Sequence, residues 1–376
     1  MFTDKENATR SEMTAEKSLR KARSCRWQKR SSMGKIMFDK KYVSSREPIV
    51  FKTPIRVLSH AAVGGKNEKK GPLGEYIDVY CDDEKLSCDT WENAESEMCR
   101  IALDIALSKA KIKESTVDYL IAGDLMNQCT GAGYGLSSFD IPYFGLYGAC
   151  STFAEGITIG GMMIESGAAN CVAIVVSSHF CTAERQYRFP LEYGSFAEET
   201  AQTTVTGAGC VILCKDSEKG VFLTSALPGI VCDRGIKDAA NMGAAMCTAA
   251  ADTLIRYFEK SELSTKDFDL VATGDLGHEG FLMAREMLIP KIAGIEKVYN
   301  DCGIMIFDTK TQDVGSGGSG CGCSAVVTAG YIMSQLEEKK MKRVALAGTG
   351  AMMSPQSLLQ GRSIPAVAHL VTFESR

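Results

Sequence analysis

The apolar residues of this chain follow two kinds of pattern, helical spacing and short continuous runs. Helical spacing predicts a helix over 91–110, and a run rich in small residues predicts a buried helix over 151–167. A loop rich in Gly and Lys is predicted over 64–74. Apolar runs predict strands at 48–51, 55–59, 117–122, 141–147, 171–178, 203–213, 221–227, 344–350 and 366–373. Helices that alternate with buried strands indicate an α/β fold.

Part of this pattern occurs twice. Residues 95–124 return without a gap as 246–275, and both copies predict an amphipathic helix followed by a strand that ends at Gly-Asp-Leu. A second match pairs the segment from Cys150 to the strand 171–178 with the segment from Cys323 to the strand 344–350. A repeat of this length indicates two fused, pseudo-symmetric half-domains, and a ligand site is expected at their junction.

The duplication divides the chain into three parts, 1–45, 46–235 and 236–376. The first part is a basic arm with twelve Lys or Arg residues and five acidic residues, and its lack of periodicity predicts disorder. A weak electrostatic tether to anionic lipid is the alternative for this arm. The second and third parts are the N-terminal and C-terminal halves.

Composition narrows the class of protein. The 376 residues are 45% hydrophobic, enough for one large or two medium cores, and no run of 18 apolar residues predicts a membrane span. The net charge of −4 argues against a nucleic-acid partner.

The fifteen cysteines do not form a secreted disulfide framework, so we expect a reducing, cytoplasmic compartment. No metal site is expected from the single short pair Cys321 and Cys323. Cysteines in apolar segments are interpreted as small packing residues, namely Cys171, Cys210, Cys214 and Cys247.

Cys150 is the most chemically suggestive residue. It follows a predicted strand and begins a predicted helix, so its side chain lies at a helix N-terminus. A thiol in that position has a lowered pKa and can act as a nucleophile. The alternative is a small residue that fits a tight turn, and spacing alone does not decide between the two.

Two βα halves with a cysteine at the first strand–helix junction resemble the thiolase superfamily, and residues 205–213 resemble a strand of its β-ketoacyl synthase III branch. Further motifs together are similar to the stage V sporulation protein AD (SpoVAD) family; they lie at 71–74, 122–128, 147–152, 177–179, 182–190, 301–303 and 317–321. The resemblance covers about residues 46–373. It implies a thiolase-like α/β fold in which two pseudo-symmetric halves form an αβαβα layered body.

The resemblance also implies a function. Members of this family bind dipicolinic acid (pyridine-2,6-dicarboxylate), alone or as its calcium chelate, for uptake into the developing spore. The expected protein is a non-catalytic subunit that acts with small membrane proteins of the same sporulation operon, on the cytoplasmic side and peripheral to the forespore inner membrane. No cofactor is expected. Fold analogy also implies a homodimer formed through the sheet edge near Cys150.

Three hypotheses follow: a binding protein, an acyl-thioester transferase or condensing enzyme that uses Cys150, and a scaffold with a vestigial pocket. A condensing enzyme needs two histidines, or a histidine and an asparagine, beside the thiolate. No histidine occupies the strand end at 271–276, where His278 is the nearest, and the loop 316–322 contains no asparagine. We therefore expect no firm catalytic residue beyond the nucleophile-equivalent Cys150.

A dipicolinate site needs donors for two carboxylates and a flat wall for the ring. Arg185 and Arg188 can supply guanidinium donors, although a salt bridge of Arg185 with Glu184 or Glu192 is the alternative. Tyr187 or Tyr193 can stack on the ring, and the helix start at Cys150 can bind a carboxylate. Asp124 and Asp275 follow equivalent strands, where they either cap loops or contact the calcium chelate. The complete predicted ligand set is Cys150, His179, Arg185, Arg188, Asp124, Asn127, Asp275, Ser319 and Cys321, and for His179 a buried structural role is the alternative.

Overall fold

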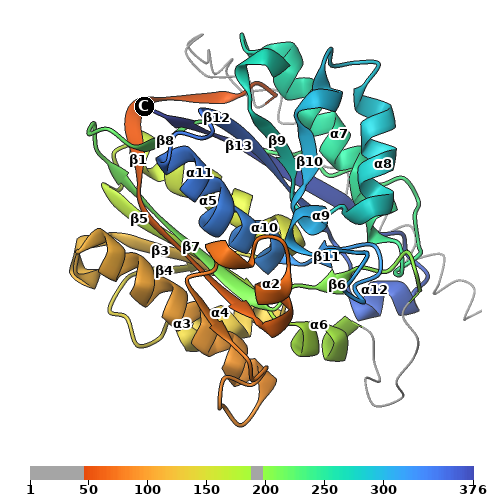
Figure 1. Ribbon diagram of the computed structural model, residues 1–376, viewed down its shortest axis with the longest axis horizontal. Coiled ribbons are helices and arrows are strands. Elements are labelled where there is room, and N and C mark those ends of the chain that lie inside the picture. The colour runs from red at the N-terminus through yellow and green to blue at the C-terminus, as the bar shows by residue number, and fades with distance from the viewer. Residues whose placement is uncertain (1–45, 188–197) are drawn as a thin grey trace, which may run out of the picture. The chain divides into compact units, whose positions relative to one another are not determined.

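The computed structural model describes residues 46–187 and 198–376, and the predicted arm 1–45 lies outside them. The two halves of the repeat have the same strand order (Figure 1). In the first half the order is β4 (Tyr143–Gly145), β3 (Tyr119–Gly123), β5 (Cys171–Ser178), β7 (Gly207–Lys215) and β1 (Ile49–Gly65). In the second half it is β10 (Tyr299–Asp301), β9 (Leu270–Thr273), β12 (Arg343–Ala351), β13 (Ala366–Ser375) and β8 (Val221–Leu227).

Strand directions match between the halves as well. In each half the three strands farthest from the junction are parallel, and the next two are antiparallel to their neighbours. Strands β1 and β8 pair antiparallel and join the halves into one 11-stranded sheet, in which β2 (Val79–Cys81) pairs with β1. The sequence repeat is therefore a duplication of the fold, as predicted.

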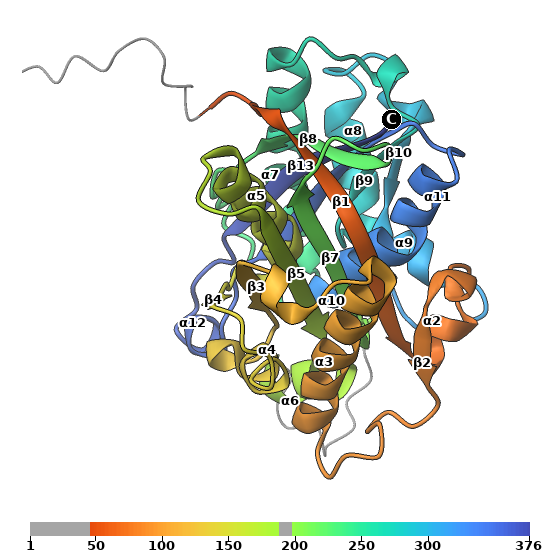
Figure 2. The same ribbon diagram turned by 90° about the vertical axis from the view of Figure 1, so that its left-hand side faces the viewer.

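Helices form three layers around the two halves of the sheet (Figure 1, Figure 2). Helix α5 (Thr152–Glu165) contacts strands of both halves, and beside it α10 (Cys321–Val327) continues through a π-helical turn into α11 (Met333–Glu337). Helices α3 (Trp91–Ala110) and α4 (Thr130–Gly135) cover the outer face of the first half, and α7 (Met242–Lys260) and α8 (Gly277–Leu288) cover the second. The layer order is αβαβα, which confirms the predicted fold class.

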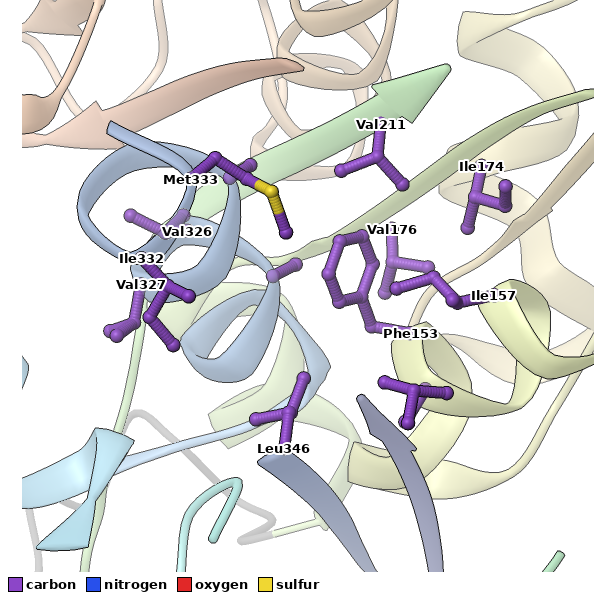
Figure 3. Close-up of a cluster of buried hydrophobic side chains, with 14 of the residues drawn as sticks. Phe153, Ile157, Ile174, Val176, Val211, Val326, Val327, Ile332, Met333 and Leu346 are labelled. Atoms are coloured by element: carbon purple, nitrogen blue, oxygen red, sulfur yellow. The ribbon is translucent and has the colours of Figure 1, made fainter. Parts of the chain in front are cut away.

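Apolar side chains fill the spaces between these layers. The central cluster lies between the two sheet halves and includes Phe153, Ile157 and Leu346 (Figure 3). Strand β5 is buried along its whole length: Ile174 joins the central cluster, and its neighbour Val175 joins the cluster beneath α3. A strand that is covered on both faces has a continuous apolar sequence, which explains why the run 171–178 was recognisable.

Three predicted elements differ from the structure at the N-terminal side. The predicted strands 48–51 and 55–59 are one strand, β1, which continues through the start of the predicted loop to Gly65. Residues Lys66–Lys70 of that loop form a short helix, α2. Pro54 is tolerated inside β1 because the register with β8 shifts between Val50 and Ile55, so that no ladder hydrogen bond is lost there.

The predicted strand 203–213 is divided in two. Its first residues form β6 (Thr203–Thr204), which pairs with β11 (Gly318–Ser319) away from the main sheet, and the rest forms β7. The division occurs because side chains satisfy the backbone between the two strands. Glu68 accepts the Thr206 N–H at 2.9 Å, and the Ser178 hydroxyl donates to the Val205 carbonyl at 2.6 Å. The remaining short helices are α6 (Phe180–Tyr187), α9 (Cys302–Ile306) and α12 (Pro355–Leu359).

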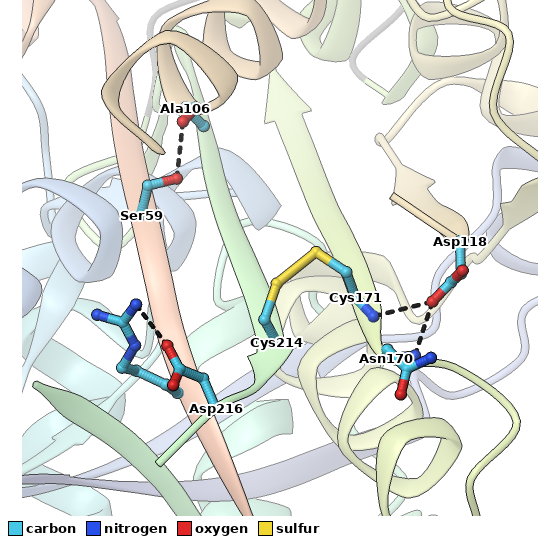
Figure 4. The surroundings of a disulfide bond; sticks show 8 residues. Ser59, Ala106, Asp118, Asn170, Cys171, Cys214 and Asp216 are labelled. Carbon is cyan, nitrogen blue, oxygen red and sulfur yellow. Dashed lines mark hydrogen bonds and ion pairs between the residues drawn. A yellow bond between two sulfur atoms is a disulfide. The ribbon is translucent and has the colours of Figure 1, made fainter. Parts of the chain in front are cut away.

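Cys171 and Cys214 face one another across β5 and β7, and a disulfide joins them (Figure 4). The prediction that both are only packing residues is therefore wrong. Strand register decides which cysteines are neighbours, and the sequence pattern does not reveal it. Beside the disulfide, the Asp118 carboxylate accepts the N–H groups of Asn170 and Cys171 at 2.6 and 3.0 Å and fixes the start of β5.

Candidate functional site

Cys150 lies in a tight turn between β4 and α5. The residue before it, Ala149, has a φ of 51°, in the left-handed region that is unfavourable for residues with a side chain. The Thr152 hydroxyl stabilises this turn, because it donates to the Ala149 carbonyl at 2.6 Å and accepts the Gly148 N–H at 3.0 Å. The turn aims a side chain that is only 6% exposed into the junction between the halves.

The second half contains an equivalent turn. Gly320 has a φ of 95° and precedes Cys321, the first residue of α10, as Ala149 precedes Cys150. Cys321 thus resembles Cys150 in following a residue with positive φ, whereas the sequence match aligned Cys150 with Cys323. The thiol of Cys321 is fully buried and donates to the Ser177 carbonyl at 2.9 Å.

Asp275 reaches the Cys150 thiol from the end of β9 and hydrogen-bonds to it. The Asp275 carboxyl also accepts the Gly320 N–H at 2.8 Å and the Thr349 hydroxyl at 2.7 Å. Burial raises the pKa of Asp275 to about 8, despite these hydrogen bonds. Burial also raises the pKa of Cys150 well above its usual range, and the Asp275 carboxyl raises it further. The expectation of a lowered thiol pKa is overturned, and the thiol is protonated at neutral pH.

A cavity of about 230 Å³ opens beside Cys150. Residues of both halves line it, so the cavity lies at the junction of the halves. Helix α6 forms one wall, the loop before α7 forms another, and the end of β12 forms a third. The lining is mostly apolar and consists of Leu125, Ala149, Cys150, Ala183, Glu184, Tyr187, Thr204, Ala239, Ala240, Met242, Ser319, Ala351 and Met353.

Two tyrosines fix the side of the cavity formed by α6. The Tyr187 hydroxyl donates to the Leu125 carbonyl at 2.8 Å, and it also hydrogen-bonds to the Tyr147 hydroxyl. Burial raises the pKa of Tyr147 to about 12 and raises the pKa of Tyr187 further. Both hydroxyls therefore stay protonated, and the Tyr187 ring is held in place as a wall of the cavity.

Four predicted ligand residues come together at this junction: Cys150 and Ser319 line the cavity, Asp275 hydrogen-bonds to Cys150, and Cys321 begins α10 next to the Gly320 turn. Arg188, with Tyr193 and Glu192, lies outside the described residues. Tyr187, predicted as a stacking residue, lines the cavity, whereas Arg185, His179, Asp124 and Asn127 of the predicted ligand set do not.

Arg185 lies on the outer side of α6. Its guanidinium donates to the Glu92 carboxylate at 2.7 Å and lies 4.7 Å from the centre of the Trp91 ring. Its side chain is 49% exposed. The predicted alternative of a salt bridge is correct in kind, but the partner is Glu92 of α3, which sequence distance concealed.

His179, Asp124 and Asn127 make local contacts. The fully buried His179 ring bonds to the Glu84 carbonyl at 2.7 Å and accepts the Cys181 N–H at 3.1 Å, and burial lowers its pKa, so the ring is neutral. Asp124 accepts the N–H groups of Met126 and Ala132 at 2.8 and 2.7 Å, as a loop-capping carboxylate does. Asn127 is exposed, and its backbone N–H donates to Gln186.

All four histidines of the chain lie in its described part. His60 bonds to the Ala329 carbonyl and to Glu337, and His179 bonds to Glu84. His278 is exposed on α8, and His369 accepts the Gly229 N–H. None of these rings lines the cavity or contacts the Cys150 thiol in the described structure.

Several lining residues were missed by sequence reasoning. Ala183, Ala239 and Ala240 have no functional group, and only their size makes room for a ligand. Met242 and Met353 were missed for the same reason, because apolar side chains carry no motif. Thr349, which holds Asp275, follows from no spacing rule but lies at the end of β12, where sites in parallel sheets gather.

Across 46–187 and 198–376, no cluster of three or more His, Cys, Asp or Glu side chains has a geometry suited to a metal ion. Within the same ranges no helix has both the length and the apolar content that crossing a bilayer requires.

Sequence comparisons give a consistent result. The family model described as stage V sporulation protein AD (SpoVAD) matches residues 45–374. Stage V sporulation protein AD of Bacillus subtilis (strain 168) is 39% identical over 332 residues, which cover 88% of this chain and 98% of that protein.

Solved structures with a similar fold are far more distant in sequence. The 3-oxoacyl-(acyl-carrier-protein) synthase III from Aquifex aeolicus VF5 has a TM-score of 0.53 at 15% identity and covers 85% of this chain and 99% of its own. OleA from Xanthomonas campestris has a TM-score of 0.54 at 14% identity, with coverage of 86% and 99%. At such identities the likeness establishes the thiolase-like fold and nothing further.

Proposed function

The chain belongs to the stage V sporulation protein AD family and has a role in sporulation, and we propose that it binds dipicolinic acid for uptake into the developing spore. The ligand occupies the cavity beside Cys150, and the protein binds it without making or breaking a covalent bond. A cavity of about 230 Å³ suits one small ring with substituents, because drug-sized ligands need about 300 Å³ or more.

The observation that carries this proposal is the position of the buried Cys150 thiol in an apolar cavity, where burial, and then the Asp275 carboxyl, raise the thiol pKa. An enzyme that forms acyl thioesters needs a thiolate, and its activating group lowers the thiol pKa. At this site the neighbouring group is a carboxyl, which has the opposite effect. The flat Tyr187 ring and the Cys150 N–H at the start of the helical turn suit an aromatic carboxylate.

Charge favours the calcium chelate over the free dianion. The described lining contains one carboxyl, Glu184, and no Lys or Arg. These lining residues supply no cation for a free dianion, whereas a one-to-one complex with Ca²⁺ has no net charge and needs none. Arg188 is next to Tyr187 in the sequence, outside the described residues, and remains a proposed contact for one carboxylate.

Isothermal titration of dipicolinate with and without Ca²⁺ tests the proposal. Benzene-1,3-dicarboxylate is the matched control, because it has the same outline and lacks the ring nitrogen. We expect saturable binding of dipicolinate that strengthens with Ca²⁺, and much weaker binding of the control. Absence of dipicolinate binding under both conditions would remove the proposal and leave the scaffold hypothesis.

Acyl transfer is the second candidate, because the strained turn at Ala149 presents Cys150 to the cavity. Incubation with acetyl-CoA followed by intact mass measurement tests it, with Cys150→Ser as the control. We expect no acetyl adduct on the wild-type protein. A stable adduct that is absent from the variant would establish the enzyme hypothesis instead.

We also propose the expected assembly, in which the protein is peripheral to the forespore inner membrane on its cytoplasmic side and contacts small membrane proteins of the same operon. A homodimer through the edge strand β4 is part of this proposal. Tyr143 and Phe144 on β4 are 41% and 48% exposed, and unpaired strand edges with exposed aromatic residues favour pairing. Light scattering of the wild-type protein and of Phe144→Lys tests the dimer, and a wild-type monomer would contradict it.

A further inference from the structure

Glu95 interrupts an otherwise apolar helix face. It lies on α3, is 0% exposed, and occupies the position that Met246 occupies in the second copy of the repeat. Met246 is also 0% exposed and packs in an apolar cluster. The fold therefore needs only an apolar side chain at this position, and a buried carboxyl there requires another reason.

The Glu95 carboxyl connects three elements. Its Oε2 accepts the hydroxyl of Thr182, on α6, at 2.6 Å, and its Oε1 accepts the hydroxyl of Ser177, on β5, at 3.1 Å. Thr182 is in the first turn of α6, and the same helix provides Ala183, Glu184 and Tyr187 to the cavity wall. Glu95 thus fixes the wall at its base, while Glu92 and Arg185 connect α3 and α6 at the surface.

The groups around Glu95 are acidic or neutral. Asp124 faces it from the loop after β3, Glu92 lies one turn away on α3, and the Cys99 thiol contacts Ser177 at 3.0 Å. Cys321 on α10 approaches from the site and bonds to the Ser177 carbonyl. None of the facing groups carries a positive charge. Burial, and then the Asp124 charge, raise the pKa of Glu95 to about 8.

We propose that Glu95 is a positioning residue for the cavity: its protonated form holds the first turn of α6 against α3 and β5, and loss of the proton releases that wall and weakens ligand binding. The Thr182 hydroxyl has one hydrogen and also lies 3.0 Å from the His179 carbonyl, so it can donate there while it accepts the proton of a protonated Glu95, which in turn accepts from Ser177. An ionised Glu95 places a second charge beside Asp124 without a cation. The link to the ligand rests on the proposed function, whereas the link between Glu95 and α6 does not.

Hydrogen exchange of residues 180–187 tests the link to α6 without any ligand. In the wild-type protein we expect protection factors to fall about tenfold between pH 7 and pH 9, because only about a tenth of Glu95 keeps its proton at the higher pH. Glu95→Gln is neutral at every pH and retains the hydrogen bonds, so its protection should not change with pH. Equal pH dependence in wild type and Glu95→Gln would overturn the proposal.

Two further variants separate positioning from packing. Glu95→Met copies the second repeat and should fold, as judged by thermal unfolding, but should lack α6 protection at both pH values. Wild-type protection in Glu95→Met would show that the carboxyl only fills space and would also overturn the proposal. Asp104→Asn removes an exposed carboxylate elsewhere on α3 and should retain the wild-type pH dependence.

Dipicolinate affinity is measured on the same proteins between pH 7 and pH 9, where the ligand carboxylates stay ionised. The affinity of the wild-type protein should fall between pH 7 and pH 9, and ionisation of Asp275 causes part of this fall. The rest of the fall, about tenfold, arises from Glu95 and should be absent from Glu95→Gln. If dipicolinate binds to none of the proteins, the proposed function fails while the exchange experiment still decides the role of Glu95.

Discussion

The thiol of Cys150 and the carboxyl of Asp275 hydrogen-bond to one another across the junction of the two halves. Each belongs to a different copy of the repeat, so the duplicated fold brings them together. Burial and the neighbouring carboxyl both disfavour the thiolate, so the thiol stays protonated, as the proposed non-covalent binding requires.

Replacing Asp275 with Asn tests this relationship. The amide removes the charge that disfavours the thiolate, so the pKa of Cys150 should fall, and alkylation of Cys150 by iodoacetamide at pH 8 should become about tenfold faster for each unit of the shift. The rate is measured by peptide mass spectrometry, with Cys150→Ala to identify the site. An unchanged pH profile of alkylation would show that Asp275 does not control the thiol.

Stability should decrease as pH rises. Asp275 has a folded-state pKa of about 8, above its ordinary value of 3.8. Between these values the folded state keeps a proton that the unfolded state releases, so the stabilisation present at low pH is lost as pH rises towards 8. Urea unfolding at pH 6 and pH 8.5 should give a lower free energy at the higher pH, and a smaller decrease for Asp275→Asn. Equal decreases in both proteins would contradict this assignment.

Filling the cavity should abolish binding while the fold remains. Ala183 lines the cavity from α6, and Leu is compatible with a helix, so Ala183→Leu should reduce dipicolinate affinity at least tenfold at a cost of about 1–3 kcal/mol in stability. Ala168→Leu changes an exposed alanine after α5 and serves as the matched control. Wild-type affinity in Ala183→Leu would place the ligand elsewhere.

Arg185→Ala should change dipicolinate affinity by less than about twofold. The guanidinium pairs with Glu92 at the surface, and exposed pairs contribute about 0–1 kcal/mol. Titration of Arg185→Ala beside Arg188→Ala compares the two predicted donors directly. A large loss of affinity in Arg185→Ala would mean that α6 rearranges when the ligand binds.

Much of the fold was predictable because its signals are local or repeated. The predicted helix 91–110 and the predicted strand 171–178 have the same bounds as α3 and β5. The sequence repeat alone indicates the two halves. The division of 203–213 was not predictable, because it depends on Glu68 and Ser178, which are distant in the sequence.

The site was predictable only in part. Cys150 and Asp275 stand out because each follows a strand in the repeat, where ligands of α/β sheets gather. Their hydrogen bond, and its effect on the thiol pKa, needs the geometry of both halves. Glu95 was predictable only in part as well. The sequence repeat aligns it with Met246, but only the fold shows which hydroxyl groups contact its carboxyl.

The most direct test of non-covalent dipicolinate binding in the cavity is an experimental structure determined with calcium dipicolinate. We predict that the pyridine ring lies against Tyr187 in the cavity and that the Cys150 thiol is unmodified. A ring bound outside this cavity, or a covalent group on Cys150, would contradict the account.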